Sequence, residues 1–303
     1  MAAQAYALAM RRAHAALVLT TMLAGCSGAS SAVPTSPSAS GTQPSATALS
    51  SSVQLRGYIM DTAFRPLAGA RVEVVDGPSA GTTAVSGDDG QVVLRGSFNE
   101  STRFRASKDG YEARTQPWNC SVAVCLGASG AQPWLGFYLS VPEPAVNIAG
   151  DYRLTFTADS TCTELPETAR SRSYRVSVTP QPLGDRSTVP GYDVTVVGAS
   201  MLGTLTGFPI GVAGNHLSLW LHSRHDPAIV EHLGDNTYLG FSGSAEAAGV
   251  ATGASTITTA FDGWIEQVAL TAPLVKWYLP LPTPLSKSTC DSSNHRITLT
   301  RAN

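Results

Sequence analysis

The stretch from residue 150 to residue 158, GDYRLTFTA, decides the fold of the C-terminal half of the chain. Its apolar side chains occupy every second position, at Tyr152, Leu154 and Phe156, with polar side chains between them. Successive side chains of a strand point to opposite faces, so this alternation predicts an antiparallel strand with one apolar face and one wet face. The pattern returns at residues 174–178, 192–196, 217–221, 237–244, 255–267 and 295–301.

Residues 147–303 are therefore predicted to form an all-β domain of about eight strands, with a short helix at residues 164–170. An up-and-down antiparallel barrel would leave no exposed strand edges, and a two-sheet sandwich is the alternative. Residues 150–158 and 294–301 resemble the two ends of C-terminal β-domains found in secreted bacterial proteins. That resemblance implies a topology and no activity.

The preceding region, residues 53–141, alternates short strand patterns with turn signals. Strand patterns occur at residues 53–59, 71–75, 92–94 and 103–106, and Asp-Asp-Gly at residues 88–90 predicts a hairpin turn. Turn signals at intervals of about 8–12 residues are typical of a small β-sandwich. The short, stiff Pro-Glu-Pro at residues 142–144 separates this region from the C-terminal domain.

Four elements of this region resemble the carboxypeptidase regulatory-like family. They are Gly-x-hydrophobic-x-Asp, Pro-Leu-x-Gly-Ala-x-Val-x-Val, Asp-Gly-x-hydrophobic and Ala-Ser-x-x-Gly-Tyr, at residues 57–61, 66–74, 89–92 and 106–111. The resemblance implies a prealbumin-like sandwich of seven strands within the carbohydrate-binding-like fold group. It implies no catalysis.

The N-terminus reads as a lipoprotein signal peptide over residues 1–25. Arg11 and Arg12 precede a short apolar run, and residues 23–26, Leu-Ala-Gly-Cys, resemble a bacterial lipobox. The resemblance implies lipidation of Cys26 and a membrane partner in the cell envelope, at the outer membrane or cell surface. An ordinary secretory signal is the alternative. Residues 26–52 lack charge and are rich in Ser, Thr, Pro and Ala, so a disordered tether is predicted.

Four further cysteines predict two disulfides in an exported chain: Cys120, Cys125, Cys162 and Cys290. Three connectivities are open, and we favour Cys120–Cys125 and Cys162–Cys290. The first pair closes a local loop, and the second joins the start and end of the C-terminal domain. Zinc binding is the alternative, although no C-x₂-C spacing occurs.

The charge balance argues against nucleic acid as a partner. Only 14% of residues are charged, with 20 Lys+Arg against 22 Asp+Glu, so no basic field is present. Neither a G-x-S-x-G motif nor a phosphate-cradling glycine motif occurs. We therefore predict no catalytic residue and no cofactor.

Two sets of residues are candidates for ligand contact. Trp118, Trp134 and Trp220 could stack on sugars, although such rings more often pack in a core. His222, His225 and Asp226 are weak candidates for metal ligands, in a run that also contains His216, Glu231 and His232. The run matches no zinc-protease motif, and a solvated hairpin loop is the simpler interpretation.

Together these features predict a non-catalytic, lipid-anchored exported protein that displays two β-domains for binding or adhesion. A glycan or a surface protein is the expected partner, by analogy with the fold group of the first domain. One alternative is a calycin-like carrier with an apolar cavity lined by Leu154, Val176, Val194 and Leu219. The other is a metal-dependent enzyme that uses His222 and His225.

Overall fold

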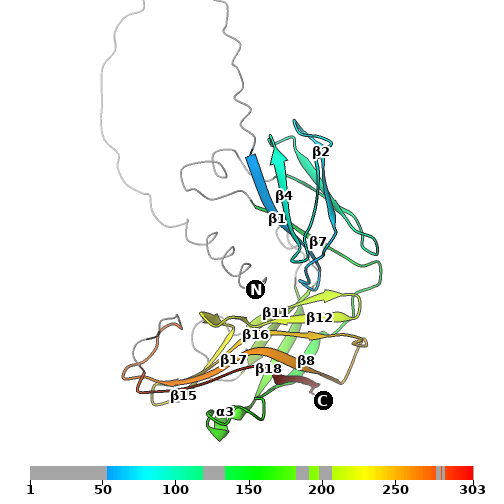
Figure 1. Cartoon of the computed structure of the whole chain (residues 1–303). Helices are drawn as coiled ribbons and strands as arrows, with labels where there is room; N and C mark the ends of the chain where they lie inside the picture. The colour runs from blue at the N-terminus through cyan, green and yellow to red at the C-terminus, as the bar shows by residue number, and fades with distance from the viewer. Residues whose placement is uncertain are drawn as a thin grey trace, which may run out of the picture.

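The computed structural model describes residues 53–118, 134–181, 191–197, 207–277, 281 and 284–302, which form an all-β protein (Figure 1). The predicted signal peptide, Cys26, the tether, Cys120 and Cys125 lie outside the described residues. The one helix of the described part, α3 (Glu167–Arg170), is shorter than predicted. No helix among the described residues is long and apolar enough to cross a membrane.

The first domain is built from two sheets that enclose one apolar core. One sheet has the order β4-β1-β7, in which β1 and β7 are parallel, and the other has the order β3-β2-β5-β6. Alternate side chains such as Val72 and Val74 fill the space between the sheets. The strands are β1 (Val53–Asp61), β2 (Arg71–Asp76), β3 (Thr83–Val85), β4 (Gln91–Gly96), β5 (Arg103–Ser107), β6 (Arg114–Pro117) and β7 (Trp134–Leu139).

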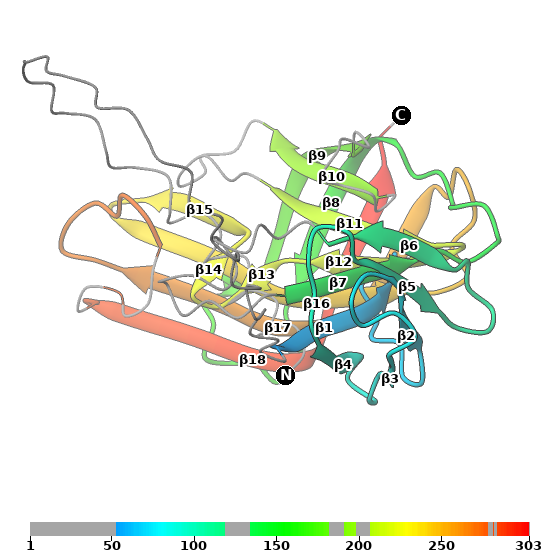
Figure 2. The same ribbon diagram turned by 90° about the horizontal axis from the view of Figure 1, so that it is seen from above.

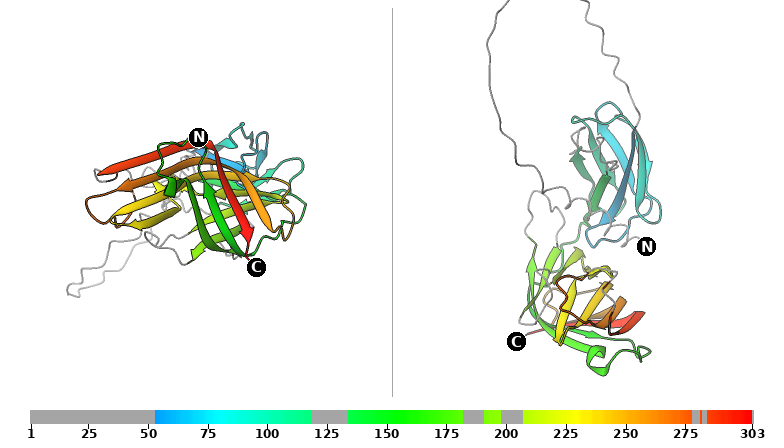
Figure 3. Two further views of the ribbon diagram at one scale, coloured as in Figure 1. Left: turned by 90° about the horizontal axis from the view of Figure 1, so that it is seen from below. Right: turned by 90° about the vertical axis from the view of Figure 1, so that its left-hand side faces the viewer.

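The C-terminal domain is a closed antiparallel barrel, which selects the barrel over the sandwich (Figure 3). Neighbouring strands follow the chain, and the ring closes because β12 pairs with β16 and β18 pairs with β8. The eight strands of the ring are β8 (Gly150–Thr157), β9 (Ser171–Pro180), β10 (Gly191–Val197), β11 (Gly207–Ala213), β12 (His216–Trp220), β16 (Thr237–Ala247), β17 (Thr256–Ala269) and β18 (Ser286–Arg301).

One position in the ring is occupied by an interrupted strand. The second half of β16 pairs with β12, and its first half pairs with β15 (Ile229–Gly234) (Figure 2). Residues 221–228 leave the barrel wall between these two strands and form a small hairpin of β13 (His222–Ser223) and β14 (Asp226–Pro227). The predicted hairpin is therefore present around His222, His225 and Asp226, whereas residues 229–234 belong to the barrel wall.

The last strand begins earlier than the sequence pattern predicted. Residues 286–294 are polar at nearly every position, yet they pair with β17 along its whole second half. Backbone hydrogen bonds to β17 therefore replace apolar alternation as the cause of strand formation. The two strands change register between Phe261 and Gly263, where the barrel wall bends.

Two glycines allow β16 and β17 to approach each other at this bend. Gly243 has a φ of +141°, and a Cβ on it would lie 2.1 Å from the carbonyl oxygen of Asp262. A Cβ on Gly263 would lie 2.1 Å from the carbonyl oxygen of Ser242. No larger residue fits at either position, so this glycine pair sets the curvature of the barrel here.

The two domains meet where a loop of the first packs on the outer wall of the second. The ring of Phe64 lies so close to Gly211 of β11 that a Cβ there would be 2.6 Å from it. Asp61 is fully buried and holds this loop by accepting hydrogen bonds from the backbone N–H groups of Ala63 and Arg65 at 2.9 Å and 3.0 Å. The Asp61 carboxylate also binds the Arg65 guanidinium.

Candidate functional site

The lumen of the barrel is packed with side chains. Leu154, Val176, Val194 and Leu219, which the carrier alternative requires around a cavity, have exposed fractions of only 0–2% within one apolar core. The rings of Phe156 and Phe241 stack across this core with centroids 4.3 Å apart. In the described part of the barrel, these side chains fill the space that a ligand in the lumen would need.

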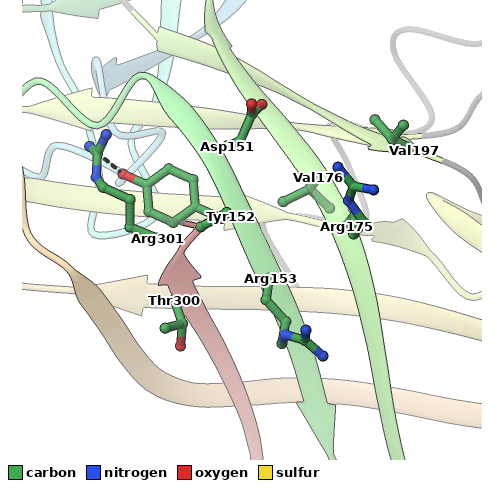
Figure 4. A pocket seen from close by; sticks show the side chains of 9 residues that line it. Asp151, Tyr152, Arg153, Arg175, Val176, Val197, Thr300 and Arg301 are labelled. Atoms are coloured by element: carbon green, nitrogen blue, oxygen red, sulfur yellow. Dashed lines mark hydrogen bonds between the residues drawn. The ribbon is translucent and has the colours of Figure 1, made fainter.

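A pocket of about 720 Å³ lies against the outer wall, where β8, β9 and β10 meet the end of β18 (Figure 4). This volume falls within the range of about 300–1,000 Å³ that is typical of small-ligand sites. Five of its side chains are on the wet face of their strands: Asp151, Arg153, Arg175, Val197 and Thr300. Arg301 lies at the edge of the pocket.

Strand register places the pocket side chains in one row across the sheet. Thr300 of β18 pairs with Arg153 of β8, Arg153 pairs with Arg175 of β9, and Arg175 pairs with Val197 of β10. Side chains that are directly opposite on neighbouring strands have Cβ atoms roughly 4.5–5.5 Å apart. The Cβ atoms of Arg153 and Arg175 are therefore neighbours on the same face. In the described part of the chain, neither arginine forms an ion pair.

Arg301 is held differently from the other two arginines. Its Nη2 donates a hydrogen bond of 2.8 Å to the Tyr152 hydroxyl, and its guanidinium carbon lies 5.0 Å from the centroid of the Tyr152 ring (Figure 4). The Tyr152 hydroxyl in turn donates to the carbonyl of Ile148 at 2.9 Å. These contacts fix Arg301 as a rigid edge of the pocket.

The hairpin at residues 221–228 lies against the outer wall of the barrel. Arg224 donates a hydrogen bond of 2.8 Å to the buried carboxylate of Glu266, and its guanidinium lies 5.9 Å from the centroid of the Trp264 ring. Lys287 makes a second ion pair with Glu266 at 2.7 Å. The ion pair between Arg224 and Glu266 therefore holds the hairpin against the barrel, and no pattern in the sequence indicated this contact.

The candidate metal ligands of this hairpin are spread over different contacts. His222 has a φ of +62° and its ring lies 4.9 Å from that of Trp220, while Asp226 pairs with Ser223 in the small hairpin. Among the described residues, the group of three with ligand atoms close enough to share a metal ion is Cys162, Cys290 and His295. It contains no residue of the hairpin, and its two sulfurs are joined in a disulfide. Geometry does not bring His222, His225 and Asp226 together as a ligand set.

Glu231 and His232 contact other residues of the barrel and stabilise its wall. Glu231 is 8% exposed and accepts hydrogen bonds from Arg172 and from the Tyr174 hydroxyl, the latter at 2.7 Å. Burial, with the nearby charge of Glu231, raises the pKa of Tyr174 well above its usual range, so its hydroxyl stays protonated and donates. The ring of His232 stacks on Tyr238 with centroids 4.9 Å apart.

The predicted Cys162–Cys290 disulfide is present, with a Cα–Cα distance of 5.6 Å. It fastens the loop before α3 to β18. Beside it, the fully buried His295 accepts a hydrogen bond at Nδ1 from the backbone N–H of Asp159 at 2.9 Å. Burial lowers the pKa of His295, so its ring is neutral in the folded protein.

The lowered pKa of Asp159 makes the stability of the fold depend on pH in the acid range. Hydrogen bonds from the backbone N–H of Thr161 and from the hydroxyls of Ser292 and Thr161 lower its pKa to about 2. Because the folded pKa lies below the ordinary value, the carboxylate stabilises the fold above about pH 4, and this contribution is lost as the pH falls towards 2. Asp159→Asn should have a lower urea midpoint than the wild type at pH 7. The difference between the two midpoints should shrink as the pH falls from 4 to 2.

Ser292→Ala is the matched variant, because it removes one donor and keeps the carboxylate. Its urea midpoint at pH 7 should lie between those of the wild type and Asp159→Asn. Parallel pH curves for the wild type and Asp159→Asn would contradict this role of Asp159.

Trp118 belongs to the core of the first domain. It is 9% exposed, and its ring packs on Phe104 and Phe98 with centroid distances of 5.7 Å and 5.9 Å. So little of the Trp118 ring is accessible that a sugar could not stack on it. Trp118 is therefore a core residue and not a ligand-contact residue. Trp134 begins β7, but its side chain is outside the described part. Trp220 is half-buried on the outer face of β12.

The pocket residues Arg153, Arg175 and Thr300 were not among the candidates from sequence. Alternation alone places Arg153 on the wet face of its strand, and the same argument applies to Arg175. Their proximity depends on the register between β8 and β9, which no local sequence pattern specifies.

Comparison with known proteins gives no family for the chain: no protein-family model matches it, and no curated protein matches its sequence.

Proposed function

We propose that this chain is a non-catalytic, lipid-anchored protein of the bacterial cell envelope that displays two β-domains for binding, with a glycan as the ligand. One observation carries the binding part: the barrel has a full lumen and an arginine-lined pocket on its outer wall. A barrel of this kind offers a ligand its surface rather than its interior. Such exterior binding suits a protein held at a membrane by a tether.

Three sequence features support display at the outer membrane or cell surface. Residues 23–26 resemble a lipobox, which predicts a lipid anchor, and the composition of the uncharged segment up to residue 52 predicts a tether with a reach of about 30 Å. The resemblance of residues 53–141 to the carboxypeptidase regulatory-like family supports a non-catalytic module in the first domain. Its two facing sheets, of three and four strands, are compatible with that assignment.

Replacing Cys26 with Ala tests the anchor. Only a thiol at this position can accept the diacylglycerol, so the variant should lose all fatty-acid label and keep its signal peptide. Growth with an alkyne fatty acid, followed by gel analysis of the purified full chain, measures both. Cys120→Ala is the matched control and should keep its label. Labelling of Cys26→Ala at the wild-type level would refute the lipid anchor.

A glycan array probed with the purified full-length protein tests the binding function. We expect retention on a subset of glycans. Absence of binding to every glycan at high protein concentration would refute the glycan part of the proposal.

A further inference from the structure

Arg153 and Arg175 form a pair of positive charges on the outer wall, and neither has an ion-pair partner in the described part of the barrel. Arg153 and Arg175 lie directly opposite each other, and like charges in that relation destabilise a sheet. Two other arginines of this domain bind buried acids: Arg172 binds Glu231, and Arg224 binds Glu266. An anion placed between Arg153 and Arg175 would remove their repulsion, so the pair is suited to an anionic ligand.

The remaining pocket residues narrow the class of that anion. Guanidinium groups bind carboxylates with two parallel hydrogen bonds. Asp151 can accept hydrogen bonds from hydroxyl groups, Thr300 can both donate and accept, and Val197, which is 49% exposed, offers an apolar edge. A ligand that fits all of these groups carries a negative charge, several hydroxyls and an apolar face.

A sugar acid has this combination of groups. We propose that the outer-wall pocket binds a uronic-acid residue of an acidic polysaccharide, with Arg153 and Arg175 on its carboxylate and with Asp151 and Thr300 on its hydroxyls. This inference rests on the proposed glycan-binding function and names its ligand class. An anionic membrane surface suits the pocket less well, because Asp151 would face the lipid phosphates and repel them.

The experiment uses the full-length protein and one pair of probes. The first probe is a polyuronate oligosaccharide, and the second is the same oligosaccharide with its carboxyl groups reduced to alcohols. Isothermal titration should show binding of the first, weakened by added salt, and binding of the second that is weaker by at least about tenfold. Arg153→Gln/Arg175→Gln should lower the affinity for the polyuronate by at least about tenfold.

Arg296→Gln is the matched control, because Arg296 is exposed on β18 and does not line the pocket. It should leave the affinity unchanged. The double variant should also unfold at the same temperature as the wild type or slightly above it, since a repulsive pair has been removed. A large decrease in its unfolding temperature would mean that the arginines are structural, which would overturn the inference.

The remaining outcomes separate this inference from the proposed function. Equal binding of both probes, or unchanged affinity in the double variant, would overturn the acidic-sugar site and leave glycan binding intact. Failure to bind any glycan would overturn both. Binding to vesicles of phosphatidylglycerol without binding to polyuronate would overturn the inference in favour of a lipid surface.

Discussion

Replacing Cys162 and Cys290 together with serine should lower the free energy of unfolding of the barrel by about 4–5 kcal/mol. The disulfide closes a loop of 128 residues that spans nearly the whole C-terminal domain. Breaking it frees the unfolded chain from that constraint, and the chain-entropy relation gives this value for so long a loop. Urea unfolding of the wild-type and variant full-length chains, followed by tryptophan fluorescence, measures the difference.

The matched control is the double substitution Cys120→Ser/Cys125→Ser. It leaves the long loop closed, and the predicted Cys120–Cys125 bond closes a short loop, for which the entropy loss is smaller. A decrease below about 1 kcal/mol for Cys162→Ser/Cys290→Ser would contradict the role of the bond. It would show that the unfolded chain gains little freedom when the bond is absent, because residual structure already restrains it.

The second large effect is expected at Glu231, which is buried inside the barrel wall. Glu231→Leu should lower the free energy of unfolding by about 2–4 kcal/mol, because it leaves the Arg172 guanidinium and the Tyr174 hydroxyl without their acceptor. The estimate lies below the value for a fully buried pair because the Arg172 side chain is 30% exposed. Chemical denaturation at pH 7 measures the loss.

A double-mutant cycle separates the ion pair from packing. Arg172→Met/Glu231→Leu should regain most of the stability, since apolar groups of similar size can replace a buried pair at little cost. Glu231→Gln should lie between the wild type and Glu231→Leu, because the amide oxygen still accepts from Tyr174. Equal stability of Glu231→Leu and the wild type would contradict the assignment.

Alternation predicted the class of the C-terminal domain and most of its wall. Leu154, Val176, Val194 and Leu219 all point into the core, as period-two spacing requires. Prediction failed where a strand lacks that spacing. In β15, Glu231 occupies an inward position that an apolar residue would ordinarily fill, and its distant partners Arg172 and Tyr174 make this possible.

The candidate site was harder to predict than the fold. Tryptophans and histidines were candidates for ligand contact because of their residue type. Trp118, however, lies in a core, and His232 stacks on Tyr238 of a neighbouring strand. The arginines of the pocket are ordinary wet-face residues until β8 and β9 are aligned. Their significance depends on register and on the lack of an ion pair to either arginine in the described part, and both are tertiary properties.

Protection of individual arginines from chemical modification tests most directly that the barrel binds its ligand on the outer wall. The full-length protein is treated with phenylglyoxal with and without the polyuronate oligosaccharide, and the modified residues are quantified by mass spectrometry. The ligand should slow modification of Arg153 and Arg175 and leave Arg296 unchanged. Equal rates at all three arginines, with the oligosaccharide demonstrably bound, would place its site elsewhere and contradict the account.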